Sequence, residues 1–194
     1  KHAGEDFDNR FSPLSAMPLK KHIRRFLEYL EIEKGRSPRT VENYEFFLGR
    51  FSDFAKVDSP TAITPKLVRR YKLFLNRYRD RNGRPLKKSS RNHHLIVLRS
   101  FLRYLARHEG MGVLSPDRVE LADEGDREIK VLDEDALARL LSAPDPKTKQ
   151  GLRDKAILEF LFSTGLRVSE LVGLDVSDIN LKTREVSVLG KRRK

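Results

Sequence analysis

Apolar residues recur at helical spacing in four sets between residues 18 and 109. Steps of three and four residues place the members of each set on one face of a helix. The sets are Leu19, Ile23, Phe26, Leu27 and Leu30; Val41, Tyr44, Leu48 and Phe51; Leu67, Tyr71, Phe74, Leu75 and Tyr78; and Leu95, Leu98, Phe101, Leu102 and Leu105. This pattern predicts four amphipathic helices that pack their apolar faces into one compact domain.

Residues that commonly start or end helices separate the four sets. We expect Gly35 to end the first helix, Ser37-Pro38 to cap the second, Thr64-Pro65 to open the third, Asn82-Gly83 to close it, and Ser89 or Ser90 to cap the fourth. The segments on either side of this domain lack the periodicity. Residues 110–130 are rich in Gly, Pro and acids, as a linker between domains is, and residues 1–17 are expected to form a poorly ordered leader.

Residues 131–194 carry a different pattern. A helix is expected at 133–142, where Asp133, Glu134 and Asp135 suit the positive end of the helix dipole and mark a helix start instead of a metal site. The next helix, within residues 153–164, is apolar on nearly all sides, so we expect it to be buried. Gly165 ends this helix, and a short helix is expected at 166–174.

The end of the chain alternates as a β-hairpin does. A short strand is expected at 177–180, a turn at 182–183, and a second strand at 185–189 with Val186 and Val188 on one face. The fold class is therefore mainly α, with a four-helix domain followed by an α+β part made of helices and a hairpin.

Composition excludes several classes of function. The chain has no cysteine, which excludes disulfides, thiolate zinc sites and a cysteine nucleophile. No stretch approaches the ~18 uninterrupted apolar residues of a membrane span, so we expect no membrane partner and a cytoplasmic location. The adjacent His93 and His94 have no third ligand at a suitable spacing, so no metal is expected either.

Basic residues are concentrated in one part of the chain. The whole chain has a net charge of +12. Residues 18–109 hold 23 basic and 9 acidic residues, a net charge of +14, whereas residues 1–17 and 110–194 each have a net charge of −1. A localised excess of this size indicates a polyanionic partner, and nucleic acid is the first candidate.

Two expected helix starts collect side chains of the types that contact phosphates and base edges. Helix N-termini also present backbone N–H groups and a dipole that favours phosphate. The candidate DNA-binding residues are Arg36, Ser37, Arg39, Thr40 and Asn43 at one start; Lys87, Lys88, Ser89, Ser90, Arg91, Asn92 and His94 at the other; and Arg99 farther along the fourth helix. For any one of these residues, a solvated surface is the alternative interpretation.

Arg167 and Lys191 are the candidates for chemistry. Arg167 is expected in the first turn of the short helix, where a cation faces the positive end of the helix dipole. Glu170, three residues later, could pair with Arg167, or the guanidinium could clamp a phosphate through two N–H groups. Lys191 follows Gly190 at the edge of the hairpin, although four terminal basic residues are also typical of a solvated tail.

One long stretch is recognisable. Residues 153–191, RDKAILEFLFSTGLRVSELVGLDVSDINLKTREVSVLGK, resemble the start of the catalytic domain of tyrosine site-specific recombinases, the phage integrase family, and most of all its Xer-like branch. SPRTVENYEFFLGRF and LIVLRSFLRYL are similar to that family's helical core-binding domain. The resemblance covers residues 18–191. It implies a DNA-binding core-binding domain at 18–109, a linker at 110–130, and the N-terminal part of the catalytic domain at 131–194.

The resemblance also implies roles for individual residues. Arg167 would clamp the scissile phosphate, Glu170 would support Arg167, and Lys191 would act as general acid toward the 5′-hydroxyl leaving group. A nucleophilic tyrosine would form a phosphotyrosyl bond that conserves the energy for religation, so no cofactor is implied. The complete enzyme would act on duplex recombination sites as a homo- or hetero-tetramer.

The sequence departs from the family pattern in two places. The usual Gly-Lys-Gly-x-Lys turn reads Gly-Lys-Arg-Arg-Lys over residues 190–194, and the family's later His-x-x-Arg motif and nucleophilic tyrosine would lie beyond Lys194. We therefore expect this chain to bind duplex DNA without cutting it. The alternatives are a non-catalytic DNA-binding protein or inhibitor derived from a recombinase, and a general RNA-binding helical module.

Overall fold

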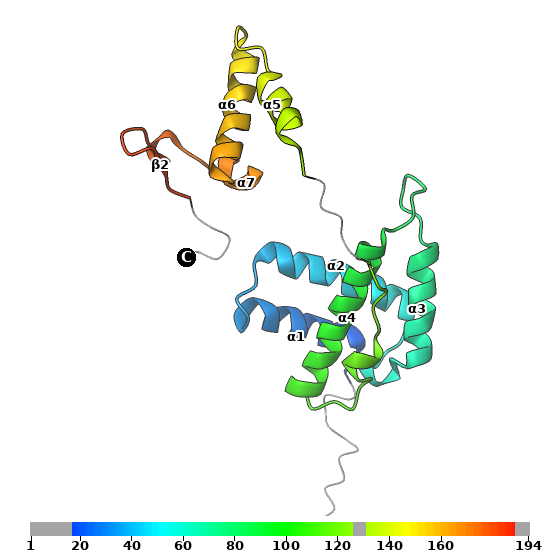
Figure 1. The fold of residues 1–194 in the computed structure, drawn as a ribbon. Helices are drawn as coiled ribbons and strands as arrows, with labels where there is room; N and C mark the ends of the chain where they lie inside the picture. The colour runs from blue at the N-terminus through cyan, green and yellow to red at the C-terminus, as the bar shows by residue number, and fades with distance from the viewer. Residues whose placement is uncertain (1–16, 126–130, 189–194) are drawn as a thin grey trace, which may run out of the picture. The chain divides into compact units, whose positions relative to one another are not determined.

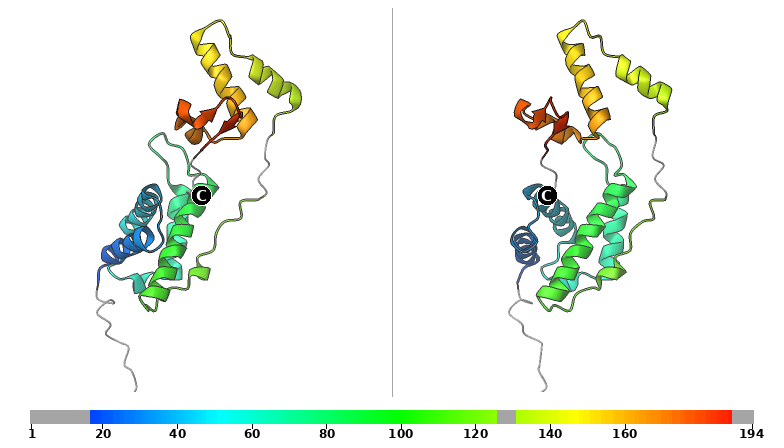
Figure 2. Two further views of the ribbon diagram at one scale, coloured as in Figure 1. Left: turned by 90° about the vertical axis from the view of Figure 1, so that its left-hand side faces the viewer. Right: turned by 60° about the vertical axis from the view of Figure 1, so that its left-hand side comes forward.

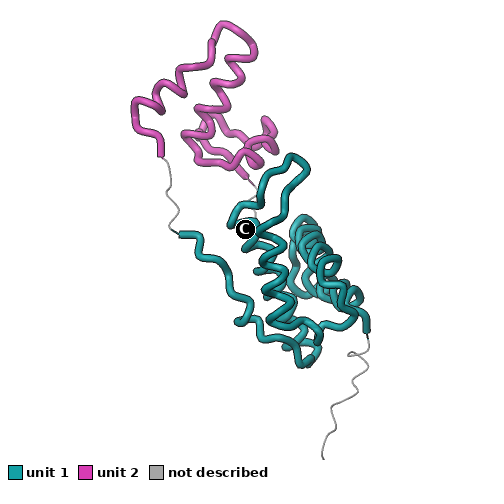
Figure 3. Tube along the Cα trace, turned by 90° about the vertical axis from the view of Figure 1, so that its right-hand side faces the viewer, with its two compact units in different colours: residues 1–127 teal, residues 128–194 magenta. Residues whose placement is uncertain are grey.

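The computed structural model describes residues 17–125 and 131–188. The chain forms two compact units, a first unit of residues 1–127 and a second unit of residues 128–194 (Figure 3). Most of the expected leader and the candidate Lys191 lie outside the described residues.

Four helices build the first unit, as the apolar spacing predicted (Figures 1 and 2). Their bounds are α1 (Leu19–Ile32), α2 (Pro38–Ala55), α3 (Pro65–Arg77) and α4 (Lys88–His108). Two short 3-10 helices, η1 (Pro60–Ala62) and η2 (Pro116–Arg118), lie in the connections. Each expected apolar set supplies buried side chains from its own helix, because steps of three and four residues return to the same face.

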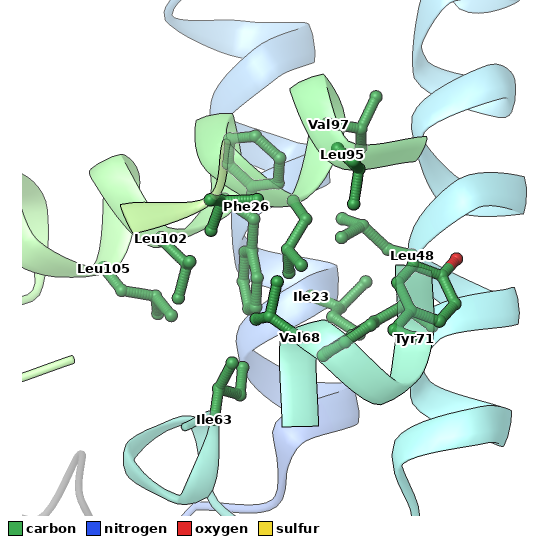
Figure 4. Close-up of a cluster of buried hydrophobic side chains, with 14 of the residues drawn as sticks. Ile23, Phe26, Leu48, Ile63, Val68, Tyr71, Leu95, Val97, Leu102 and Leu105 are labelled. Carbon is green, nitrogen blue, oxygen red and sulfur yellow. The ribbon is translucent and has the colours of Figure 1, made fainter. Parts of the chain in front are cut away.

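Helix α4 lies at the centre of the first unit, in contact with α1, α2 and α3. Its side chains Leu98, Phe101, Leu102 and Leu105 have no exposed surface. The other three helices add apolar side chains to the same cluster, of which Figure 4 labels Ile23 and Phe26 from α1, Leu48 from α2, and Val68 and Tyr71 from α3. Each fully buried large side chain contributes about 1.5–3 kcal/mol relative to an exposed one, so this cluster supplies most of the stability of the unit.

The helix ends follow the sequence signals in part. Thr64 caps α3, since its Oγ1 accepts the N–H of Leu67 at 3.2 Å. The expectation that Asn82-Gly83 closes α3 is wrong, because α3 ends at Arg77. These two residues instead form a tight turn in a loop whose flanks pair at an isolated bridge, and Gly83 has a φ of +73°.

The predicted serine cap of α4 is also wrong. The N-cap residue is Lys87, and it makes no side-chain capping bond. Ser89 and Ser90 lie within the first turn of the helix. The signal failed because a serine just inside a helix start looks the same in the sequence as a serine at the N-cap.

Residues 111–125 pack against α4, although they fall within the segment expected to be a linker. Val119 is fully buried. Asn92 of α4 holds the segment by its amide group: Nδ2 donates to the carbonyl oxygen of Ala122 at 2.7 Å, and Oδ1 accepts the N–H of Ala122 at 2.9 Å. The Asn92 side chain thereby satisfies both the C=O and the N–H of Ala122, which lies outside any helix or strand.

The second unit contains helices and a small hairpin. Its elements are α5 (Glu134–Ser142), α6 (Lys149–Thr164), α7 (Val168–Val172), η3 (Val176–Asp178), β1 (Ile179–Asn180) and β2 (Glu185–Val186). The strands are antiparallel, with Ile179 opposite Val186. The helix expected at 133–142 is α5, and Asp133 is its N-cap residue instead of lying in its first turn, since its Oδ1 accepts the N–H of Ala136 at 2.7 Å. The hairpin is shorter than predicted because residues 177 and 178 belong to η3.

The prediction that the helix at 153–164 is buried is wrong for the structure described. In α6, Leu152 and Phe162 are each 59% exposed. The helix is apolar on nearly all sides, but within the second unit its main contacts are with the short α5 and α7. These two elements are too small to surround a four-turn helix.

No helix among the described residues is long and apolar enough to cross a membrane.

Replacing Asn92 tests how residues 111–125 are held. We expect Asn92→Ala to lower the free energy of unfolding of the first unit by about 2–3 kcal/mol, because both backbone groups of Ala122 lose their partners. Urea unfolding monitored by circular dichroism measures the change. The control is Asn43→Ala, which removes an exposed side chain of α2 and should stay within about 0.5 kcal/mol of the original protein. Equal stability of the two variants would contradict the assignment.

Candidate functional site

Most of the candidate DNA-binding residues lie on the surface at the starts of α2 and α4. At the first start, Arg36, Ser37, Arg39 and Asn43 are exposed. Thr40 is half-buried, and its Oγ1 lies 2.9 Å from Oγ of Ser37. The Arg39 guanidinium donates to Glu42 at 3.0 Å on the same helix. This pair is exposed and weak, so a phosphate can replace the carboxylate at small cost.

The start of α4 presents a second basic cluster. Lys87 and Lys88 are exposed, and Arg91 is half-buried. Lys88 Nζ donates to the carbonyl oxygen of Asp123, and Arg91 Nη1 donates to Oδ1 of Asn76. Neither cation forms an ion pair with a carboxylate among the described residues. Both charges therefore remain available to an anion.

The starts of α2 and α4 belong to neighbouring helices. One turn after Asn43, the ring of Phe47 lies 6.5 Å from the ring of His93, which is itself one turn after Ser89. The two basic helix starts are therefore connected through packed side chains of one rigid unit. Such an arrangement allows both helices to contact the same polyanion.

Two of the candidate residues are structural. Asn92 is 4% exposed and is committed to Ala122 and to Glu124 Oε1, at 2.7 Å. His94 is 3% exposed, with its Nδ1 3.0 Å from the hydroxyl oxygen of Tyr71. Burial and the positive charge of Arg50 lower the pKa of His94 to about 4, so its imidazole is neutral at pH 7. The polar atoms of Asn92 and His94 are therefore engaged within the first unit and do not lie on the surface with the other candidates.

Arg99 has a different environment from the rest of the set. It lies three turns into α4, half-buried, and its guanidinium is 3.7 Å from Asp117 in η2. This contact joins α4 to the segment that follows it. Arg99 is therefore separated from the helix starts, and its charge is partly compensated by Asp117.

The sequence did not single out Arg50, although its surroundings are unusual. Its guanidinium carbon lies 4.7 Å from the ring centroid of Phe46 and 4.5 Å from that of Tyr78. Nη1 lies 3.5 Å from Nε2 of His94. The Phe46–Arg50 spacing of four residues was a usable signal for one of these contacts, but the approach of Tyr78 from α3 is a tertiary contact.

Arg167 and Glu170 form a defined pair at the start of α7. Gly165, with a φ of +67°, ends α6, and Arg167 is the N-cap residue of α7. Glu170 Oε2 accepts the backbone N–H of Arg167 at 2.8 Å, and Oε1 accepts Nη1 at 2.8 Å. These hydrogen bonds to the carboxylate lower the pKa of Glu170. The Glu170 side chain is 14% exposed, whereas that of Arg167 is 70% exposed.

Arg167 pairs with Glu170, which was one alternative from the sequence, and its guanidinium can still bind a phosphate, which was the other. Glu170 occupies one terminal nitrogen of Arg167, and the other N–H groups of the guanidinium make no hydrogen bond among the described residues. Both side chains line a hollow of about 560 Å³ with Ser169, Asp178 and Ser187. A fixed guanidinium at an open polar hollow is suited to binding a phosphate.

No nucleophilic tyrosine lines this hollow among the described residues. All five tyrosines of the chain belong to the first unit. Burial raises the pKa of Tyr71, and burial together with Glu109 raises that of Tyr104 to about 12, which makes both poor nucleophiles. The described residues also contain no group of three or more His, Cys, Asp or Glu side chains that could hold a metal ion.

Two family models match the chain. The model described as "Phage integrase, N-terminal SAM-like domain" matches residues 23–109, and the model described as "Phage integrase family" matches residues 130–194. The first match contains the basic starts of α2 and α4. The second match contains Arg167 and Glu170.

Curated relatives match along most of the chain. A tyrosine recombinase XerC of Pelobacter propionicus is 39% identical over 177 residues, which cover 90% of this chain and 57% of the relative. A tyrosine recombinase XerD of Listeria innocua is 34% identical over 167 residues, which cover 86% and 55%. A solved structure titled "Crystal structure of XerA recombinase" is 27% identical, with a TM-score of 0.40, over 89% of this chain and 55% of that one. The chain thus spans little more than half the length of these relatives.

The lowered pKa of His94 predicts a pH dependence of stability. Between pH 6.5 and 4 the unfolded chain binds a proton at residue 94 that the folded chain does not, so the stability of the first unit should fall as the pH is lowered through this range. Urea unfolding at pH 7 and pH 5 measures the difference. His94→Gln should remove most of this pH dependence, whereas His93→Gln, which removes only the last and smallest cause of the lowered pKa of His94, should leave most of it in place. An NMR titration of His94 with a midpoint above 6 would contradict the account.

Proposed function

This chain belongs to the phage integrase family, and from that premise we propose that it functions in site-specific DNA recombination as part of a tyrosine recombinase. The observation that carries the proposal is the Arg167–Glu170 pair at the polar hollow, which lies in the segment matched by the family model. The localised charge of the first unit supports DNA as the partner.

The proposed chemistry is phosphoryl transfer at a DNA phosphodiester. Arg167 binds the non-bridging oxygens of the scissile phosphate and neutralises the charge that develops in the transition state. Glu170 acts as a positioning residue, because it holds both the backbone and the guanidinium of Arg167. Lys191, outside the described residues, donates a proton to the 5′-oxygen as its bond to phosphorus breaks, so that it leaves as a hydroxyl.

The nucleophile in this proposal is a tyrosine that none of the five in this chain supplies. Their positions in the first unit and the raised pKa values of Tyr71 and Tyr104 argue against that role. The phosphotyrosyl bond of the intermediate conserves the energy of the phosphodiester. The reaction therefore needs neither ATP nor a metal ion, and the complete enzyme assembles as a homo- or hetero-tetramer on two recombination sites.

The two parts of the chain have separate roles in this proposal. Residues 18–109 form the core-binding domain, which binds duplex DNA through the starts of α2 and α4. Residues 131–194 form the N-terminal part of the catalytic domain, and residues 110–130 connect the two. Phosphate contacts from Arg36, Arg39, Lys87, Lys88 and Arg91 position the domain on the duplex.

DNA binding by the first unit should depend steeply on salt. We expect the logarithm of the affinity for duplex DNA to fall with the logarithm of salt concentration by a slope of roughly −0.9 per phosphate neutralised. Lys88→Gln and Arg91→Gln should each flatten this slope by about one unit. Fluorescence anisotropy with a labelled duplex measures it. The matched control is Lys20→Gln, an exposed lysine of α1 away from both helix starts, and an equal effect there would contradict the assigned interface.

Removing the guanidinium of Arg167 should abolish chemistry without abolishing binding. In a full-length protein that carries this chain and the nucleophilic tyrosine, Arg167→Gln should slow formation of the covalent complex with a nicked suicide substrate by about 10²–10³-fold or more. Denaturing gels measure the complex, and anisotropy shows that binding is retained. Arg153→Gln, an exposed arginine of α6, is the control. Normal cleavage by Arg167→Gln would contradict the role of Arg167.

A further inference from the structure

A groove runs between α2 and α3 on the surface of the first unit. Two neighbouring hollows, of about 700 and 390 Å³, share Phe54 and Phe74 as common walls. The larger hollow is also lined by Phe46, and the smaller by Leu73 and Tyr78. The two hollows therefore form one continuous aromatic surface, which we call the α2–α3 groove.

The α2–α3 groove exposes more apolar surface than a solvated helix face needs. Phe46 is 55% exposed and Leu73 is 48% exposed. The rings of Phe54 and Phe74 stack with centroids 4.8 Å apart, and Phe74 meets Tyr78 edge-on at 5.9 Å. Contiguous exposed apolar surface beside charged residues is typical of a binding site for a protein segment.

The rim of the groove is basic. It carries four cations and one acid, namely Arg50, Lys56, Arg70, Arg77 and Asp53. Among the described residues, none of these cations forms an ion pair with a carboxylate. An occupant that matches both the walls and the rim must combine an aromatic or aliphatic side chain with acidic neighbours.

The chain itself contains such a segment. Residues 5–8 read Glu-Asp-Phe-Asp, so Phe7 is flanked by three acids, and a second aromatic residue, Phe11, follows four residues later. The described residues begin at Met17. Pro18 lines a further hollow together with Asp53 and Lys56, and these two residues also line the α2–α3 groove.

The leader is long enough to reach the groove. Eleven peptide units separate Phe7 from Pro18, and an extended chain of that length spans up to ~36 Å. The chain thus enters at one end of the groove with the acidic and aromatic residues within reach of its basic rim. Tethering raises the effective concentration of such a segment into the millimolar range, so modest contacts suffice for binding.

We propose that residues 5–11 bind in the α2–α3 groove of the same chain. Phe7 packs against the aromatic walls, and its flanking acids pair with Arg70 and Arg77 on the rim. The inference does not depend on the recombinase proposal, because it rests on the groove and on the composition of the leader.

A single tryptophan tests this docking, because the chain has none of its own. In Phe7→Trp, we expect the tryptophan emission to be blue-shifted from that of a free peptide with the sequence of residues 1–16 and the same substitution. The acrylamide quenching constant should be at least about twofold lower than that of the free peptide, since pockets of this kind bury most of a bound side chain. Emission and quenching equal to those of the free peptide would overturn the proposal.

Second substitutions locate the binding site. In the Phe7→Trp protein, Phe46→Ser or Arg70→Glu should return the quenching constant to that of the free peptide. Arg69→Glu is the matched control, because Arg69 is exposed on the same helix but does not line the groove. Circular dichroism establishes that each variant is folded. An equal effect of Arg69→Glu and Arg70→Glu would overturn the assigned site.

Two further measurements distinguish the leader of the same chain from a second copy or DNA as the occupant of the groove. Quenching that is unchanged over a hundredfold dilution supports binding within one chain, and quenching that rises on dilution would overturn it in favour of a second copy. Addition of duplex DNA should leave the emission of Phe7→Trp unchanged. A tryptophan emission that moves to that of the free peptide when DNA is added would show that DNA competes for the groove, and would overturn the assignment of the groove to residues 5–11 alone.

Discussion

The first unit depends on the burial of α4 among the three helices around it. Leu98, Phe101, Leu102 and Leu105 have no exposed surface, so the orientation of α4 is fixed by close packing along its length. The orientation of α4 then determines which polar side chains near its start are buried and which are exposed. Asn92 and His94 are buried and hydrogen-bond with Ala122 and Tyr71, whereas Lys87 and Lys88 remain in solvent. One packing constraint thereby determines both the fold and the basic surface.

In the second unit, the turn between α6 and α7 fixes the position of Arg167. Gly165 allows α6 to end in a left-handed turn, and Arg167, the N-cap residue of α7, follows two residues later. Glu170 then binds both ends of Arg167, so a long flexible side chain is held at the polar hollow before any phosphate binds. Pre-organisation of this kind lowers the entropic cost of binding a phosphate, and in the proposed reaction it is the contribution of Glu170.

The sequence predicted the four helices, the helix start at residues 133–135 and the hairpin because each depends on residues close together in the chain. It did not predict which polar residues of α4 are buried, because a shift of one position along a helix turns a side chain from solvent to the core. The burial of α6 was wrongly predicted because periodicity reports what a helix could bury and not which neighbours are present. The groove beside Arg50 was missed because Phe46 and Tyr78 meet only in the tertiary structure.

The central claim is that the starts of α2 and α4 are the surface that contacts DNA. Backbone NMR spectra of the chain titrated with duplex DNA test it most directly, because they report on every residue without a substitution. The account predicts that the largest shifts occur at residues 36–43 and 87–91, and that they decline together as salt is added. Shifts confined to other surfaces, with both helix starts unchanged, would contradict it.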